Sequence, residues 1–555
     1  MIGSTLDLIE ISWVLLIIGV TASIAWLIAP YITKIYTHES SLIDRVFDPI
    51  ENLIYRIIGI DKNRGMDWKE YFLTGLFVNL IMMALTFSIF LFQGVLPLNP
   101  QHFSSLNWNL ALNNVISFMT NTDLQHYAGE STLSYLSQTA AVQFLMFSAP
   151  ATGISMAVAM IRGFRVGAKD LGNFYLDFTR TIIRLLLPLS ILVSLVLVVL
   201  GVPQSISGYA VVRTIEGVTQ QIAIGPIASL TSITQLGSNG GGYFGANFAY
   251  PFQNPSPVSD ILELSLMLLL PTALIFVFGR LLGKKSESKP VFIAAYSMLG
   301  INLLIGFLQK VSLGPGIETR IGGFFSTFWT VISTSTNTGS LNASLYAMSP
   351  SAVLSSFMSM FIQSTPGAVG TGLIYMIMYV ILTVFIVGLM AGRTPEYLGI
   401  KITARDVGLI MLAFIIHPII ILIPTILAYT TGAAAQIGIG ANAIGFTKIF
   451  YEFSSAAANN GSDFFGVLAN TPFFNVATAI VMFVGRYAPM CILLALSGSV
   501  LGRKREAVSG LRTDSLVFAV VLVGSIIILV LLVFLPFLAL GPILAFFEGR
   551  MNFFG

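Results

Sequence analysis

The sequence predicts an all-α membrane protein with ten transmembrane helices and four pseudo-symmetric helix–pore loop–helix repeats. Three observations lead to this prediction. First, 55% of the 555 residues are hydrophobic and only 10% are charged, whereas soluble domains carry about 25% charged residues. Second, ten apolar segments reach the roughly 20 residues that a bilayer-spanning helix needs. Third, four long connections each contain a short apolar stretch followed by a polar turn.

Composition narrows the classes of function. The net charge of +3 is too small to indicate a nucleic-acid partner. The single cysteine, Cys491, excludes a disulfide within the chain, and four scattered histidines argue against a histidine-based metal centre. Residues 1–12 contain no Lys or Arg, which a secretory signal would carry near its start. We therefore expect the first apolar run to be retained as a membrane helix.

The distribution of basic residues predicts the topology. The apolar segments lie near residues 10–32, 70–94, 134–162, 180–202, 258–283, 290–310, 351–391, 406–429, 474–500 and 514–546. With the N-terminus outside, most of the 28 Lys and Arg residues fall in cytoplasmic connections, as the positive-inside rule requires. An even number of spans then places both termini outside the cytoplasm, with lipid surrounding the chain.

Pore-loop repeats are the main internal regularity of the sequence. Their apolar stretches, of about 10–14 residues, are too short to span and fit re-entrant segments. These stretches are Leu110–Met119, Ile224–Leu236, Phe324–Ser333 and Ala443–Ala456. The polar turns that follow them are Thr120–Asp123, Ser238–Gly241, Asn337–Ser340 and Asn459–Ser462. Aligning Thr122 with Gly240, Gly339 and Gly461 leaves one helix–pore loop–helix unit in each interval.

This alignment divides the chain into six parts. An N-terminal helix and cytoplasmic connector occupy residues 1–66, and a C-terminal helix occupies residues 503–555. The four repeats between them lie at residues 67–170, 171–285, 286–400 and 401–502.

Backbone carbonyls in the four turns suit the binding of a dehydrated alkali cation. Irregular backbone at membrane depth persists only where it lines water or is buried in protein. Carbonyl oxygens directed at one axis replace the hydration shell of the ion, and glycine permits the backbone angles that this needs. The candidate ligand residues are Asn121, Thr122, Asp123, Asn239, Gly240, Gly241, Thr338, Gly339, Ser340, Asn460, Gly461 and Ser462.

Two readings of these turns compete. Ordinary loops are also rich in Gly, Asn and Ser, but fourfold recurrence after a half-helix on one side favours a filter. Asp123 and Asp463 lie near the turns and are candidates for concentrating cations at the mouth, or are solvated loop acids.

A gate is predicted beneath the filter. The apolar segment 351–391 is about twice as long as a straight spanning helix requires. Its interruption contains Pro366 and three glycines, Gly367, Gly370 and Gly372, which favour a broken or re-entrant helix. The alternative is a loop that joins a surface helix to an ordinary span.

Arg486 is a charged residue inside a predicted span. Intramembrane charges usually face a cavity or a partner, so Arg486 is a candidate barrier against free leakage of cations. Snorkelling to the interface and a structural ion pair are the alternatives.

No motif indicates that the chain itself uses ATP. Asp61-Lys62 begins like the phosphorylated loop of P-type ATPases but departs after two residues, and there is no G-x-x-x-x-G-K-[ST] motif. The glycines at 240–245 match G-x-G-x-x-G, yet a half-helix rather than a strand precedes them, which argues against a dinucleotide site.

Several motifs resemble the KdpA family, the potassium-binding and translocating subunits of the bacterial and archaeal Kdp pump. The matching segments are Thr120–Gln125, Leu236–Phe244, Asn459–Ser462 and the cytoplasmic Gly392–Gly399. The likeness extends over essentially the whole chain. The third turn departs from the family pattern, since Asn337-Thr338 precedes Gly339.

The resemblance implies a subunit that does not hydrolyse ATP itself and binds no covalent cofactor. Potassium is then the transported ion, a KdpB-like P-type subunit hydrolyses ATP, and KdpC-like and small KdpF-like subunits complete the complex in the plasma membrane. Family likeness further implies that Gln125 supports the filter, that Arg486 lies beneath it, and that Phe385 lies near the exit of a tunnel leading to the ATPase subunit.

Two other functions remain as alternatives. A stand-alone potassium channel or symporter of the Trk or Ktr type would share the pore loops without an ATPase partner. An intramembrane enzyme acting on lipid or polyprenyl substrates would show paired Asp or His residues within spans, and only Asp260 with Glu263, and His417, are candidates.

Overall fold

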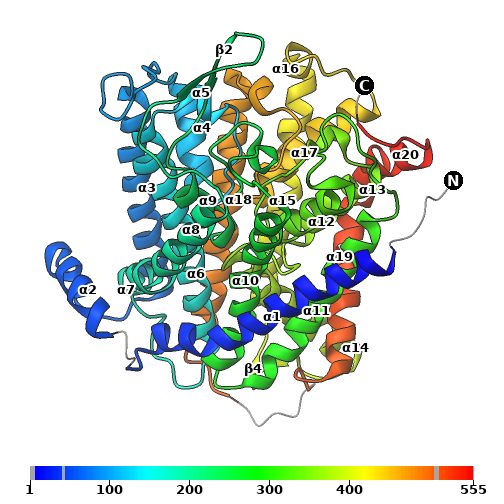
Figure 1. The fold of residues 1–555 in the computed structure, drawn as a ribbon. Coiled ribbons are helices and arrows are strands. Elements are labelled where there is room, and N and C mark those ends of the chain that lie inside the picture. Colours follow the sequence, from blue (N-terminus) through cyan, green and yellow to red (C-terminus); the bar gives the residue numbers. More distant parts are fainter. Residues whose placement is uncertain (1–6, 41–43, 506–511, 554–555) are drawn as a thin grey trace.

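The computed structural model describes residues 7–40, 44–505 and 512–553. Within these residues, ten helical segments are long and apolar enough to cross a membrane, which confirms the predicted all-α membrane protein (Figure 1). They are α1 (Leu8–Thr37), α3 (Trp68–Phe92), η1–α6 (Ser137–Gln143 and Phe144–Phe164), α7–η2–α8 (Phe174–Arg180, Thr181–Leu186 and Leu187–Val199), α10 (Pro257–Leu281), α11 (Ser288–Gly306), α14 (Thr371–Met390), α15 (Ala404–Thr430), α18 (Pro472–Val500) and α19 (Leu516–Ala539).

Four shorter helices lie between consecutive spans, where the sequence predicts re-entrant segments. They are α4 (Trp108–Met119), α9 (Ile227–Leu236), α12 (Gly322–Ser335) and α17 (Ala443–Ala458). Each packs against a spanning or flanking helix of its own repeat: α4 on α6, α9 on α8, α12 on α11 and α17 on α18. Each also ends at a predicted polar turn, so the four turns are brought into the interior of the bundle.

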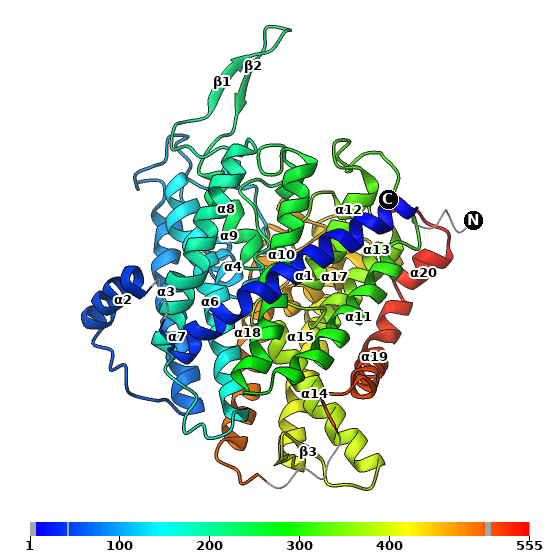
Figure 2. The same ribbon diagram turned by 60° about the horizontal axis from the view of Figure 1, so that its bottom comes forward.

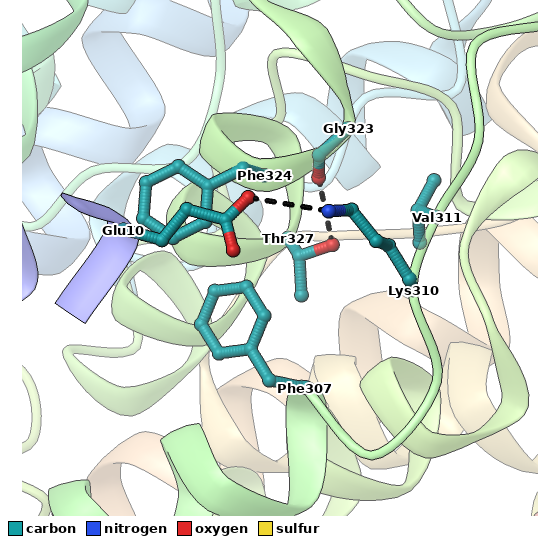
Figure 3. Close-up of a pocket in the computed structure, with 7 residues that line it drawn as sticks. All are labelled: Glu10, Phe307, Lys310, Val311, Gly323, Phe324 and Thr327. Atoms are coloured by element: carbon teal, nitrogen blue, oxygen red, sulfur yellow. Dashed lines mark hydrogen bonds and ion pairs between the residues drawn. The ribbon is translucent and has the colours of Figure 1, made fainter. Parts of the chain in front are cut away.

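Helix α1 lies at the edge of the bundle. It runs obliquely along α10 (Figure 2), and its first turn is fixed by an ion pair of 3.6 Å between Glu10 and Lys310. Figure 3 shows this pair beside the stacked rings of Phe307 and Phe324. The start of α1 is thereby held against the segment between α11 and α12.

The long apolar segment in the third repeat is broken, as predicted. Helix α13 (Pro350–Ile362) ends eight residues before α14 begins. Gly367 and Gly370 adopt φ values of 81° and 85° in this break, in the region that favours glycine. Continuing the helix through Pro366 would also cost a backbone hydrogen bond.

A helix in the connector between the first two spans was not predicted. Helix α2 (Asp44–Ile58) exposes Val46, Ile50, Leu53 and Ile57, which recur at helical spacing. Its other face is fixed by Arg184, which forms ion pairs with Asp44, Asp48 and Glu51.

The remaining elements are short. Two antiparallel hairpins were also missed, β1–β2 (Ala210–Arg213 and Thr219–Ile222) and β3–β4 (Glu396–Tyr397 and Ile400–Lys401). Figure 2 shows β1–β2 and β3 at opposite ends of the bundle. The minor helices are α5 (Gly129–Thr132), η3 (Asn247–Ala249), η4 (Lys285–Glu287), η5 (Leu345–Ala347), α16 (Ala433–Gln436), η6 (Gly466–Ala469) and α20 (Pro542–Phe547).

Candidate ion-binding site

The four polar turns share one backbone conformation. The residue directly before the aligned amide donor has a positive φ of 45–61° in every turn, and these residues are Asn121, Ser238, Asn337 and Asn459. The next residue donates its amide, over 2.8–2.9 Å, to the carbonyl oxygen five positions earlier in the pore helix. These donors are Thr122, Asn239, Thr338 and Asn460. The repeated geometry gives a structural alignment of the turns.

That alignment corrects the expected one by a single residue in the first repeat. Asp123, not Thr122, occupies the position of Gly240, Gly339 and Gly461. Aspartate tolerates left-handed backbone better than most residues, and Asp123 has a φ of 56°. The first turn therefore reaches a positive φ at this position without a glycine, as the third and fourth turns do with Gly339 and Gly461, whereas Gly240 does not have a positive φ.

Carbonyl groups from the other three turns converge on Gly240. A Cβ atom added there would lie 2.8 Å from the carbonyl oxygen of Asn460 and 2.9 Å from that of Thr122, and still closer to that of Thr338. Real Cβ atoms almost never approach other atoms within 3.0 Å. Glycine at position 240 is thus required by the close approach of these oxygens.

Contacts between neighbouring turns close a ring. Gly461 abuts the carbonyl oxygen of Thr122, and Gly339 abuts that of Asn460. Gly240 abuts the carbonyl oxygen of Thr338, and the neighbouring Gly241 lies against Asp123. Each turn therefore touches the next around a common centre, in the order first, fourth, third, second.

Side chains of the turns bond outward and to neighbouring loops. Asn239 donates to the carbonyls of Met146 and Ile233, at 3.0 Å each, and Asn459 donates to the Thr122 hydroxyl at 2.9 Å. Asn121 donates across to the second turn, at the Ser238 carbonyl. Backbone carbonyls, rather than side chains, are therefore the groups that face the centre of the ring.

Gln125 joins the first and second loops. Its Nε2 donates to the carbonyl of Gly242 and its Oε1 accepts from the amide of the same residue, both at 2.9 Å. This two-point contact suits the predicted supporting role. The Ser340 carbonyl, by contrast, accepts hydrogen bonds from Ser333 (2.6 Å) and Trp329 (2.8 Å) and so points back to its pore helix.

An open cavity of about 580 Å³ lies above the ring. Residues from all four loops line it, among them Asp123, Gly339, Gly461 and Ser462. Its acidic lining residues are Asp123, Glu130, Glu318 and Asp463, and no Lys or Arg is among the described lining residues. Burial raises the pKa of Asp123 and of Asp463, so Glu130 and Glu318 supply most of the negative charge. A cavity lined by one sign of charge raises the local concentration of the opposite ion, so this one attracts cations.

The break in the third repeat lies at the carboxyl end of pore helix α12. The Thr365 hydroxyl and the Gly367 amide both donate to the carbonyl of Ser335, at 3.1 and 2.9 Å. Gly370 packs directly against the backbone of α6 at Gly153, and Gly372 lies against Gly367. The break therefore passes from the end of α12 to α6, on the side of the ring away from the cavity.

Arg486 extends from α18 to this break. It is only 3% exposed, and it donates to the Ala149 carbonyl and the Thr371 hydroxyl, at 3.2 Å each. Among the described residues it makes no ion pair with a carboxylate. Arg486 is therefore a buried charge, not a snorkelling one. Phe385 lies farther along α14 and is half-buried.

One charged pair behind the ring was not predicted. His126 and Glu452 are fully buried and 3.0 Å apart. They are separated by 326 residues, so no local pattern pairs them. The available signal in the sequence is that the fourth re-entrant stretch carries two charged residues, Lys448 and Glu452.

Comparison with known protein families assigns the chain to one of them. Its sequence matches the KdpA family, described as the potassium-transporting ATPase A subunit, over residues 15–547. The matched region contains all four pore loops, most of α1 and the other nine described spans in full. The resemblance seen in the motifs is thereby confirmed, and with it potassium transport as part of the Kdp system together with the KdpB ATPase subunit. The chain belongs to the KdpA family of potassium-transporting ATPase A subunits.

Proposed function

We propose that this subunit binds extracellular potassium in the ring formed by the four pore loops and passes it into an ATP-driven uptake pump. One observation supports this most strongly: carbonyl oxygens of Thr122, Thr338 and Asn460, from three different repeats, meet at Gly240 of the remaining repeat. Such a cage of backbone oxygens replaces the hydration shell of a potassium ion.

The other groups at the site suit a hard monovalent cation. The described residues contain no cluster of three or more His, Cys, Asp or Glu residues that would hold a metal ion. The acidic cavity supplies cations to the ring, and the side on which the cavity lies is therefore the extracellular face. Both described chain ends lie on the same side in Figure 2, in keeping with extracytoplasmic termini in a bacterial or archaeal plasma membrane.

Potassium does not leave this site straight into the cytoplasm. The broken segment and the buried Arg486 occupy the route beneath the ring, and a fixed positive charge opposes a cation in a poorly hydrated passage. A lateral exit toward the KdpB-like subunit, past Phe385, follows from this block. That partner hydrolyses ATP, while KdpC-like and KdpF-like subunits complete the assembly.

The proposal predicts saturable, potassium-selective activation. ATP hydrolysis by the assembled complex should rise with potassium at concentrations where sodium has no effect. Gly339→Ala should weaken this response, because Gly339 has a φ of 78° and abuts the Asn460 carbonyl. Gly300→Ala is the matched control, since a Cβ atom at Gly300 in α11 meets nothing within 4 Å. An unaltered potassium response in Gly339→Ala would contradict the proposal.

The stand-alone channel predicts a different result. A Trk-type or Ktr-type channel conducts without an ATPase, so the isolated subunit would pass potassium rapidly across liposomes. We expect slow flux, because the route beneath the ring is blocked.

A further inference from the structure

His126 and Glu452 form a buried contact between the first and fourth pore loops. The Nε2 atom of His126 lies 3.0 Å from Oε1 of Glu452, and its Nδ1 atom lies 2.7 Å from Oδ1 of Asn475. All three side chains have no exposed surface. Buried ion pairs of this kind contribute to positional specificity in some proteins.

Each member of the pair lies close in sequence to the polar turn of its own pore loop or to the residue that fixes that turn. His126 follows Asp123 by three residues, and Glu452 lies on α17 one turn before Ser455. Ser455 in turn accepts the amide of Asn460 through its carbonyl oxygen and the amide of Gly461 through its hydroxyl, both at 2.9 Å. A shift of Glu452 would therefore be transmitted to the fourth turn within one helical turn.

The third loop makes a related contact with different chemistry. Asn342 also follows its turn by three residues, and its Nδ2 donates to Asp260 at 2.9 Å. Asp260 is the fourth residue of α10, as Asn475 is the fourth residue of α18. Two of the repeats therefore share a contact between a pore loop and the fourth residue of a helix in a neighbouring repeat. In the first loop His126 makes this contact to Asn475 and a second contact to Glu452.

Both ring nitrogens of His126 face acceptors. The Nδ2 atom of Asn475 donates to the side-chain oxygen Oδ1 of Asn470 at 2.9 Å. The Oδ1 atom of Asn475 therefore faces His126. A histidine that donates from both nitrogens is the charged imidazolium. Burial lowers the pKa of His126, but the hydrogen bond and charge of Glu452 outweigh burial, and the pKa is raised overall.

Other titratable groups surround the pair. Burial raises the pKa of Asp463, on the loop after the fourth turn, to about 8, so this carboxyl gains its negative charge only as the solution becomes alkaline. Lys448 on α17 lies over the Tyr346 ring, 4.4 Å from its centre. Tyr451 on α17 donates to or accepts from Ser462 at 2.8 Å. At neutral pH the charged form of His126 is therefore stabilised mainly by Glu452.

We propose that charged His126 and Glu452 are positioning residues that hold the first and fourth filter loops at the spacing potassium requires. This inference rests on the proposed function of the ring. It predicts that potassium affinity depends on the protonation of His126, although His126 does not touch the ion.

The sign of the pH dependence follows from the raised pKa. A histidine whose pKa is higher in the folded state contributes fully below its ordinary value of 6.5 and loses its contribution as pH rises through the raised value. The difference in potassium affinity between wild type and His126→Gln should therefore be constant in mildly acidic solution and should shrink as the solution becomes alkaline.

The test measures the potassium concentration for half-maximal ATP hydrolysis by the assembled complex between about pH 6 and 9. His126→Gln and Glu452→Gln remove one charge each with little change of volume. We expect each to weaken affinity roughly tenfold at neutral pH, equivalent to about 1.4 kcal/mol, and to flatten the pH profile. The double variant should be no weaker than either single variant, because residues acting as one pair are non-additive.

Matched controls are available on exposed sites of the same face. His102→Gln and Glu216→Gln make the same substitutions at exposed positions and should leave affinity and its pH profile unchanged. Equal affinity of wild type and His126→Gln at neutral pH, a difference between them that does not shrink as pH rises, or additive single effects would each overturn the inference. If His126→Gln fails to assemble, Glu452→Gln takes its place, because Asp463 also titrates near pH 8 and the wild-type profile alone does not isolate His126.

Failure of this inference differs from failure of the proposed function. If wild-type complex shows no saturable potassium response, the filter itself is refuted. If that response is present but both pair variants behave like the controls, the filter stands and the positioning role does not.

Discussion

Replacing Gly240 by alanine tests the convergence of the four loops with a single methyl group. Position 240 does not have a positive φ, so alanine is not excluded by its backbone conformation. The added Cβ would instead lie 2.8 Å from the Asn460 carbonyl oxygen and 2.9 Å from the Thr122 carbonyl oxygen. Ordinary van der Waals contact begins at 3.4 Å. The variant therefore isolates the effect of displaced carbonyls.

The displacement of these carbonyl oxygens sets the expected loss of potassium affinity. Restoring contact at 3.4 Å requires each of these oxygens to move by at least half an ångström relative to position 240. Overpacking a close-packed site by one methyl group costs about 1–3 kcal/mol, and each 1.4 kcal/mol is tenfold in affinity. We expect potassium affinity to fall about 10- to 100-fold, with weaker discrimination against sodium. Gly240→Asp, which adds bulk and charge, should have the larger effect.

The assay is the potassium dependence of ATP hydrolysis by complexes that assemble normally. Gly300→Ala provides the matched control, because open space surrounds that position. Wild-type affinity and wild-type selectivity in an assembled Gly240→Ala complex would refute the convergence of carbonyls as the basis of binding.

Two further substitutions test the parts around the ring. Arg486→Ala should raise potassium flux through the isolated subunit in liposomes by at least about tenfold, because each 1.36 kcal/mol removed from the barrier to ion passage gives that factor. Flux equal to that of the control Arg213→Ala would argue against a block at Arg486. Arg184→Ala removes one of the two arginines that pair with the buried carboxylate of Glu51 and leaves Arg180 at 3.4 Å. It should destabilise the subunit by about 2 kcal/mol, seen as a lower midpoint of thermal unfolding, whereas a midpoint matching Arg213→Ala would show that α2 is not held by these ion pairs.

The spans and pore helices could be predicted because membrane burial acts on long stretches of sequence. A segment such as Ala443–Ala456 is too short to span, and its helix, α17, extends only two residues beyond the predicted end. Helix α2 was missed although Val46, Ile50, Leu53 and Ile57 recur with the period of a helix. These residues alternate with charged ones and form no long apolar run. The moderate overall hydrophobicity of α2 is typical of helices at an interface.

The register of the first turn could not be fixed from sequence. Glycine marks the shared position in three repeats, and the first repeat has aspartate there, so Thr122 was aligned with the glycines instead of Asp123. Backbone hydrogen bonds to Ser117 settle the register. The His126–Glu452 contact was likewise out of reach, because its partners meet only when the first and fourth repeats pack together.

Direct observation of the ion tests the central claim. A high-resolution structure of the complex in rubidium or potassium should show ion density at the centre of the ring, within bonding distance of the Thr122, Thr338 and Asn460 carbonyl oxygens. The same density should be absent in sodium. Ion density confined to another place in the chain, with the ring holding only water at saturating potassium, would contradict the account.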